Sequence, residues 1–346
     1  MSTVNVAAVR PGIAVGAGLA TLGLLVFIDI EFFRLAGAFS AAALLTSVIG
    51  RWRQTAAIAA TSVVVAMLSG LWHGYTFTTE WWLRVGVCAG IAVLAVASSV
   101  VRDQREERLR RMTVIAETAQ RAVLRATPTA VGSVGVASRY VSASAEARVG
   151  GDLYEVAATP FGVRVIVGDV RGKGLPAVQT ASAVLGAFRT TAFLEPDLAK
   201  LAQVIDVIVD QEPDEEEFVT AIVAEFGDDT VKLVNCGHHA PLMVSEARTE
   251  RLESDDVTVP LGLGSDPVVS DHAWPQGARL LFFTDGLVEH RDARGEFFDL
   301  EAHAGVLTGP SLDDALERLV GRLLAHGRRA LCDDLALVLT ENRAGA

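Results

Sequence analysis

Apolar residues fill four long stretches among the first hundred positions of the chain, and polar residues bound each stretch. A helix needs about 17–25 such residues to cross the hydrocarbon core of a bilayer, and the four stretches come close to that length. A buried helix of a soluble protein rarely runs so far without a charge, so four membrane-spanning helices are favoured over four buried ones. The predicted spans are residues 11–28, 35–50, 55–72 and 82–101.

Basic residues mark one side of these predicted spans. Arg10 precedes the first span, RWRQ (51–54) joins the second to the third, and an arginine-rich segment (102–111) follows the fourth. The two intervening loops, 29–34 and 73–81, carry few basic residues. Since cytoplasmic loops are enriched in Lys and Arg, we expect both termini in the cytoplasm and a multi-pass protein of the cell (inner) membrane.

A charged helix with a narrow apolar seam is predicted after the last span. Its apolar residues recur at steps of three and four, which is coiled-coil spacing over about two and a half heptads. Two interpretations stay open: the helix packs on its own domain, or residues 102–126 form the seam of a homodimer. Pro128 ends the helix. The seam consists of Leu109, Met112, Ala116, Ala119, Val123 and Ala126.

Further along the chain the pattern changes to alternating strands and helices. Residues 152–158 and 163–169 predict a hairpin, joined by a TPFG turn (159–162) that holds the Pro and Gly typical of turns. If the hairpin turns at the centre of TPFG, Asp152 and Asp169 face each other across the two strands, about 5 Å apart at their Cβ atoms. Two carboxylates so placed repel each other unless a cation lies between them.

The same arrangement recurs near the C-terminus. An apolar strand predicted within 279–287 ends in Asp285 and a glycine, and CDDLALVLT (332–340) begins a strand with Asp333 and Asp334. A lone Asp-Gly is typical of an Asx turn or a helix cap. Four strand ends that each present a short acid instead favour a cluster of oxygen ligands suited to Mg²⁺ or Mn²⁺.

The segment GDVRGKG (168–174) superficially resembles a phosphate-binding loop. A P-loop needs a hydroxyl residue directly after its lysine, and here Gly174 follows Lys173. The motif therefore argues against a nucleotide, while its glycines allow a sharp turn that brings backbone close to an ion. Lys173 either contacts phosphate or is simply solvated.

Charge divides the 346-residue chain as well. Residues 1–126 carry 12 Lys and Arg against 7 Asp and Glu, whereas the rest of the chain carries 18 against 35. An acidic C-terminal domain argues against a nucleic-acid partner, because proteins bind phosphate backbones through Lys and Arg. The three cysteines are few and unpatterned, which argues against a disulfide framework.

Six motifs in a fixed order resemble those of the bacterial PP2C-like phosphatases of the SpoIIE/RsbU type. The resemblance covers roughly residues 120–340, and the family signatures are VGGDxYD, GDVxGxG, NAGHPP, PLG, YTDGLxE and DDxxLxxL. The chain departs from them at Glu155, Cys236 and His239, and none of these is an expected first ligand of a metal. The matching segments are VGGDLYE (149–155), GDVRGKG (168–174), NCGHHAP (235–241), PLGL (260–263), FTDGLVE (283–289) and DDLALVL (333–339).

The resemblance implies an α+β fold in which two packed antiparallel sheets are flanked by helices. It also implies a site for two Mn²⁺ or Mg²⁺ ions at one end of the sandwich. By the family motif, Asp169 bridges both ions, helped by the backbone carbonyl of Val170. Asp285 and one acid of the final pair, Asp334 more than Asp333, hold one ion.

The resemblance also gives roles to the remaining motif residues. Asp152 serves the other ion, directly or through water. Asn235 and His238 are expected to be structural or to orient substrate. The implied catalytic residues are therefore the four acids Asp152, Asp169, Asp285 and Asp334.

We expect a transmembrane region (1–101), a linker helix (102–127) and a phosphatase domain (128–346). The resemblance implies a membrane-anchored enzyme that hydrolyses phosphoserine or phosphothreonine with a water activated by two metal ions. Its implied substrate is a phosphorylated STAS-type regulator in a sigma-factor pathway. The alternative is a catalytically silent domain of the same fold that docks a signalling partner at the membrane.

Overall fold

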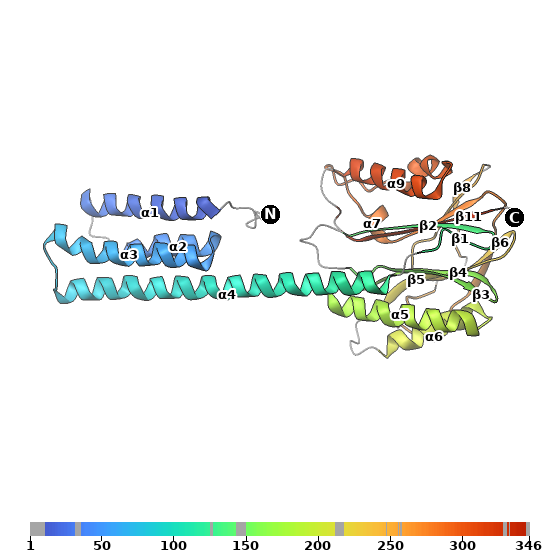
Figure 1. Ribbon diagram of the computed structural model, residues 1–346, viewed down its shortest axis with the longest axis horizontal. Coiled ribbons are helices and arrows are strands. Elements are labelled where there is room, and N and C mark those ends of the chain that lie inside the picture. The colour runs from blue at the N-terminus through green and yellow to red at the C-terminus, as the bar shows by residue number, and fades with distance from the viewer. Residues whose placement is uncertain are drawn as a thin grey trace. The chain divides into compact units, whose positions relative to one another are not determined.

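A computed structural model shows a chain that divides into two compact units, Met1–Arg111 and Met112–Ala346 (Figure 1). Ala126 of the predicted seam, Val149 of the first motif and Cys332 lie outside the described residues. The structure describes residues 11–31, 36–124, 127–142, 150–211, 218–246, 248–254, 256, 258–327, 331 and 333–343.

The N-terminal unit is helical. In the part of the chain that the structure describes, α1, α3 and α4 are long and apolar enough to cross a membrane. Helix α2 has 10 residues, which rise about 15 Å, or half the thickness of the hydrocarbon core. Three of the four predicted spans thus form helices of the required length, and the predicted span 35–50 contains a shorter one. The helices are α1 (Pro11–Glu31), α2 (Ser40–Ile49), α3 (Trp52–His73) and α4 (Thr79–Val123), with a 3₁₀ turn, η2 (Ala36–Phe39), before α2.

Helix α4 continues without a break from the predicted fourth span into the predicted linker helix, over 45 residues. Leu109 and Met112 are exposed. Further along, Ala119 packs against Val178, and Val123 packs against the core of the C-terminal unit. The end of the seam therefore packs on its own domain. The homodimer remains a prediction, because Leu109 and Met112, at the start of the seam, are exposed.

The C-terminal unit contains two antiparallel sheets, counted over its described residues. One sheet has the strand order β1-β2-β11-β10-β7-β8, and the other has the order β3-β4-β5-β6-β9. The strands are β1 (Ala130–Val131), β2 (Val134–Val141), β3 (Leu153–Thr159), β4 (Gly162–Val170), β5 (Val219–Phe226), β6 (Thr230–Cys236), β7 (Leu242–Val244), β8 (Thr249–Arg251), β9 (Val269–Ala273), β10 (Arg279–Phe283) and β11 (Leu335–Asn342).

Helices cover the outer face of each sheet (Figure 1). Helices α5 and α6 lie over the sheet that contains β4, and α9 lies over the sheet that contains β11. This architecture agrees with the predicted α+β sandwich. The helices are α5 (Leu175–Leu194), α6 (Leu198–Asp210), α7 (Asp285–Val288), α8 (Leu300–His303) and α9 (Leu312–His326), with a 3₁₀ turn, η3 (Ala304–Thr308).

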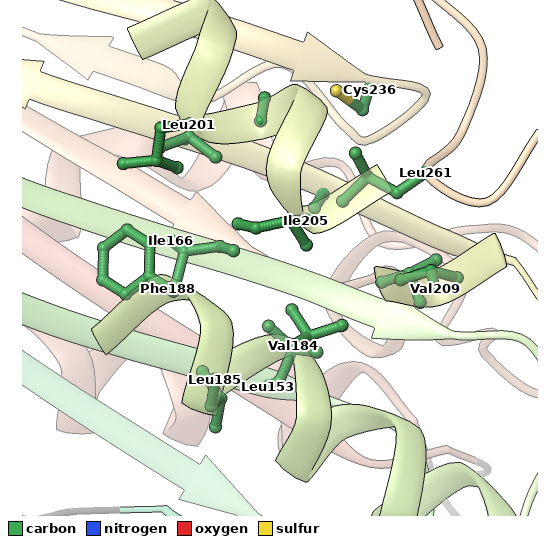
Figure 2. Close-up of a cluster of buried hydrophobic side chains, with 14 of the residues drawn as sticks. Leu153, Ile166, Val184, Leu185, Phe188, Leu201, Ile205, Val209, Cys236 and Leu261 are labelled. Carbon is green, nitrogen blue, oxygen red and sulfur yellow. The ribbon is translucent and has the colours of Figure 1, made fainter. Parts of the chain in front are cut away.

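Strand β4 is buried on both faces, and its alternate residues enter two different cores. Val165 and Val167 pack between the two sheets, whereas Ile166 packs against α5 and α6. Figure 2 shows the second core, where side chains of these two helices cover the sheet. Residues i and i+2 share a face of a strand, so Asp169 lies on the same face as Val167. The acid at the end of β4 therefore lies on the face that points toward the other sheet, and it is half-buried.

Candidate metal centre

The hairpin sets Asp152 and Asp169 against each other. Strands β3 and β4 pair with Leu153 opposite Gly168, and one further step in the same register brings residue 152 opposite residue 169. Asp152 is only 3% exposed. The predicted register is confirmed, and the two carboxylates share the end of one hairpin.

A third acid comes from the opposite sheet. Strand β10 ends at Phe283, and the chain turns into the short helix α7, whose first residue is Asp285. The strand predicted within 279–287 therefore stops before its acid. Asp285, Asp152 and Asp169 each offer a carboxylate oxygen, and these oxygens all lie within 4.8 Å of one another. Three of the four predicted catalytic acids are thus brought together.

Thr284 ties this cluster across the sandwich. Its hydroxyl donates to Oδ2 of Asp152 over 2.6 Å and accepts a hydrogen bond from the backbone N–H of Ala336 over 2.9 Å. Both bonds are buried. Thr284 therefore fixes the position of one carboxylate oxygen of Asp152.

The clustered carboxylates raise one another's pKa values. Burial, followed by the charge of Asp169, raises the pKa of Asp152 well above its ordinary value. Burial and the charge of Asp285 raise the pKa of Asp169 to about 7. Acids held this close favour a shared proton or a bound cation. Several carboxylate oxygens converging on one point fit Mg²⁺ or Mn²⁺, which prefer oxygen ligands.

Asp334, the fourth predicted acid, is engaged by hydrogen-bond donors of the protein. It is 2% exposed, and its Oδ2 accepts from the hydroxyl of Tyr140 over 2.6 Å and from the backbone N–H of Gly150 over 2.8 Å. The hydroxyl of Ser142 donates to its Oδ1 over 3.3 Å. Burial and the charge of Asp334 raise the pKa of Tyr140, so the phenol stays protonated and donates.

Asp333, the other acid of the pair, acts through its charge on different members of the cluster from Asp334, whose charge adds to burial in raising the pKa of Asp152. Burial and then the charge of Asp333 raise the pKa of Asp285, and Asp333 also raises the pKa of Asp169. Its carboxylate forms an ion pair with Lys173 over 2.7 Å. Lys173 thus contacts an acid beside the cluster, which neither of the two sequence interpretations included.

Two glycines leave room for the backbone around the acids. A Cβ atom on Gly151 would lie 2.6 Å from the carbonyl oxygen of Val170, the group predicted to assist Asp169. A Cβ atom on Gly286 would overlap the carbonyl oxygen of Asp334. Real Cβ atoms essentially never come within 3.0 Å of such atoms. Both positions therefore exclude a side chain.

His238 and Asn235 form hydrogen bonds with other groups of the protein. The side-chain amide of Asn235 donates to the carbonyl of His238 and accepts from its backbone N–H, which closes the turn. Nε2 of His238 lies 3.1 Å from the carbonyl oxygen of Phe283, and Nδ1 lies 3.0 Å from the hydroxyl of Thr220. Burial lowers the pKa of His238 to about 3, so its ring is neutral. Its Nε2 therefore donates, and the ring joins β5 to the end of β10.

Glu155, the departure from the family motif, is taken up by an ion pair. Its carboxylate binds Nε and Nη2 of Arg189 on helix α5, the former over 2.9 Å. Nη2 of Arg189 also donates to the carbonyl oxygen of Val123 over 2.8 Å, at the last residue of α4. Arg189 therefore joins Glu155 on β3 to the last residue of α4.

The sequence analysis did not single out Thr284 or Tyr140. A threonine directly before the predicted Asp285 was visible in the FTDGLVE motif, but nothing in the sequence indicated which acid it would meet. Tyr140 is 194 residues from its partner Asp334, so only the pairing of β2 with β11 reveals the contact.

Comparisons with known proteins agree with this architecture. The family model described as Stage II sporulation protein E (SpoIIE) matches residues 159–343. The SiaA-PP2C domain of Pseudomonas aeruginosa matches with 17% identity and a TM-score of 0.57, over 70% of this chain and 99% of that one. These values establish the shared PP2C-like fold of two antiparallel sheets and helices.

Two further solved structures share the fold. The RsbU and RsbW domains of a Mycobacterium tuberculosis protein match with 23% identity and a TM-score of 0.54, over 62% of each chain. The PP2C domain and regulatory-domain fragment of SpoIIE from Bacillus subtilis match with 14% identity and a TM-score of 0.51, over 61% of this chain and 64% of that one. The present chain thus spans less than two thirds of the length of these two relatives.

Proposed function

Since the chain belongs to the SpoIIE family of PP2C-type phosphatases, we propose that it is a metal-dependent phosphatase of phosphoserine or phosphothreonine in a protein substrate. The observation that carries this proposal is the convergence of Asp152, Asp169 and Asp285 within 4.8 Å. These acids come from both sheets of the sandwich, so the fold itself brings them together.

The proposed site holds two Mn²⁺ or Mg²⁺ ions, with Asp169 between them. Such a pair of ions lowers the pKa of a bound water and neutralises the phosphoryl oxygens during in-line attack. The residues of the chain hold and orient: Asp169 and Asp285 supply oxygens from opposite sheets, and Thr284 fixes the rotamer of Asp152. The carbonyl of Val170 is the proposed backbone ligand.

One acid of the final pair completes the proposed ligand set. Asp334 is the acid that the sequence favours, and in the structure it lies in a fixed, buried position held by Tyr140 and Gly150. Asp333 is the alternative, and its charge acts on Asp169 and Asp285. Mn²⁺ titrations of Asp333→Asn and Asp334→Asn separate them, since loss of a ligand weakens binding more than loss of a neighbouring charge.

The substrate and the location are also part of the proposal. We place the phosphatase unit on the cytoplasmic side of the cell membrane, because arginines gather in 102–111 directly after the apolar part of α4. The proposed substrate is a phosphorylated STAS-type regulator. The RsbU and RsbW domains joined in one relative support a regulatory partner.

The test uses the full chain in detergent with Mn²⁺. We expect hydrolysis of p-nitrophenyl phosphate and of a phosphoserine peptide, lost in Asp169→Asn and retained in Asp271→Asn, which removes an exposed acid of β9. Activity unchanged by Asp169→Asn rules out the metal assignment. Absence of activity with any divalent ion favours a silent docking domain.

A second experiment addresses the substrate. We expect the enzyme to release phosphate from a phosphorylated STAS protein faster than from an unstructured phosphopeptide of the same sequence. Equal rates on both, with p-nitrophenyl phosphate still cleaved, contradict the STAS assignment and leave the phosphatase chemistry intact.

A further inference from the structure

Gln120 occupies an unusual position for a polar residue. It lies in the last turn of α4 and is 5% exposed. A buried amide is costly unless its groups are hydrogen-bonded. Its Nε2 donates to the hydroxyl oxygen of Tyr140 over 2.6 Å and to the carbonyl oxygen of Gly150 over 3.1 Å. Since a carbonyl can only accept, the amide nitrogen must face Gly150.

These contacts continue to Asp334 and close a ring of hydrogen bonds. Tyr140 accepts from Gln120, so its single hydrogen is available to Asp334, to which it donates over 2.6 Å. The N–H of Gly150 donates to the same carboxylate oxygen over 2.8 Å. Every donor in the ring has an acceptor, and the ring joins α4, β2, the segment before β3 and the segment before β11.

The ring acts on the candidate metal centre from two directions. It holds Asp334 directly, and it holds Gly150, which lies two residues before Asp152. On the other side of Asp152, Glu155 is fastened through Arg189 to the last residue of the same helix. The end of α4 is therefore hydrogen-bonded to the chain before Asp152, at Gly150, and linked through Arg189 to the chain after it, at Glu155.

We propose that Gln120 and Tyr140 are positioning residues of the metal centre, so that the last turn of α4 sets the geometry of Asp334 and of the segment that carries Asp152. This inference rests on the proposed function. Residues that orient ligands commonly change metal affinity about 10–100-fold when they are removed.

The test compares Tyr140→Phe and Gln120→Met in the full chain. Tyr140→Phe removes the hydroxyl oxygen and keeps the aromatic side chain. Gln120→Met keeps the length of the side chain and removes both N–H donors. We expect each to weaken Mn²⁺ binding, measured by isothermal titration calorimetry, about tenfold. We expect hydrolysis of p-nitrophenyl phosphate to recover at high Mn²⁺ with its KM unchanged. The double variant is expected to be little worse than either, because both act through Asp334.

Ile205→Val is the matched control, because it loosens the core of α6 without touching the ring. It should lower thermal stability and leave Mn²⁺ affinity unchanged. Wild-type Mn²⁺ affinity in both ring variants, with only thermal stability lowered, overturns the inference while the proposed function stands. If the wild-type chain itself neither binds Mn²⁺ nor cleaves p-nitrophenyl phosphate, both proposals fail.

Discussion

Strand β4 uses charge in opposite ways at its two ends. Near its beginning, the guanidinium of Arg164 is fully buried and surrounded by acceptors. Its Nε and Nη2 bind Glu225, and its remaining donors reach three backbone carbonyls, those of Ala192, Glu195 and Pro196. The ring of Phe161 lies 4.7 Å from its charge centre.

At its far end the same strand carries Asp169, whose nearest charged neighbours are other acids. Asp285 and Asp333 raise the pKa of Asp169, and Lys173 only partly offsets them. The guanidinium at one end of the strand is thus neutralised and hydrogen-bonded by the protein itself. The carboxylate at the other end is neutralised by a bound cation or by a proton. Arg164 is thus a charge whose partners within the protein stabilise the fold, whereas Asp169 is a charge that needs a bound cation or a proton.

The largest expected effect is that of Asp169→Asn on catalysis. Loss of the proposed bridging ligand should lower kcat/KM on p-nitrophenyl phosphate by about 10³-fold or more, which corresponds to at least about 4 kcal/mol of barrier. The metal-free variant should be no less stable than the wild type, because one of the repelling charges is gone. A large loss of stability in Asp169→Asn would erase the distinction between the two ends of β4.

At the other end, Arg164→Met should lower the free energy of unfolding by about 3–5 kcal/mol, because Glu225 keeps only the longer ion pair with Lys232 and three backbone carbonyls lose their donor. The measurement is a urea titration of the C-terminal unit, followed by pulse proteolysis. Arg164→Met combined with Glu225→Leu should recover part of the loss. A cost below about 1 kcal/mol for the single variant contradicts a structural role for this pair.

The pH dependence of the metal-free protein follows from the raised pKa values of the three clustered acids, Asp152, Asp169 and Asp285; the pKa of Asp169 is about 7, against 3.8 for an ordinary Asp. The folded state binds these protons more tightly than the unfolded chain does, so protonation favours folding. In EDTA, the free energy of unfolding should therefore fall as the pH rises from about 4 towards 7. One pKa unit is worth about 1.4 kcal/mol, so the fall should exceed about 1 kcal/mol.

Two comparisons check the origin of this pH dependence. Asp169→Asn should make it shallower, since Asp152 and Asp285 still titrate with raised pKa values, and saturating Mn²⁺ should reverse it, because binding requires the ionised carboxylates. The same pH profile in Asp169→Asn and in the wild type would assign the effect to other groups.

The smallest expected effect is that of Lys173→Met. Its ion pair with Asp333 is partly exposed on both sides, and such pairs contribute about 0–1 kcal/mol to stability. Thermal unfolding should therefore change little. A stability change well above this range would make Lys173 part of the fold, like Arg164.

The sequence predicted the candidate site well where local pairing determines it. The TPFG turn fixes the hairpin register, and the register alone sets Asp152 against Asp169. The direction of the Asp285 side chain could not be predicted from strand alternation, because β10 ends at Phe283 and a helical turn changes the direction of the chain. The choice between Asp333 and Asp334 depends on distant partners, Lys173 and Tyr140, which no local pattern reveals.

Other features lay outside any sequence pattern for similar reasons. Gln120 was one polar residue among many in a charged helix, and its burial follows only from docking of α4 on the domain. Residues 35–50 have the composition of a span, but only Ser40–Ile49 forms an α-helix there. Composition indicates where a chain prefers apolar surroundings, whereas helix ends depend on local backbone geometry.

The close approach of Gly286 to the backbone of Asp334 has a genetic consequence. Any single-nucleotide change in this codon that inserts a side chain places a Cβ atom in steric overlap with the carbonyl oxygen of Asp334, directly before β11. Alleles at position 286 should therefore displace the backbone at Asp334 and lower the stability of the C-terminal unit.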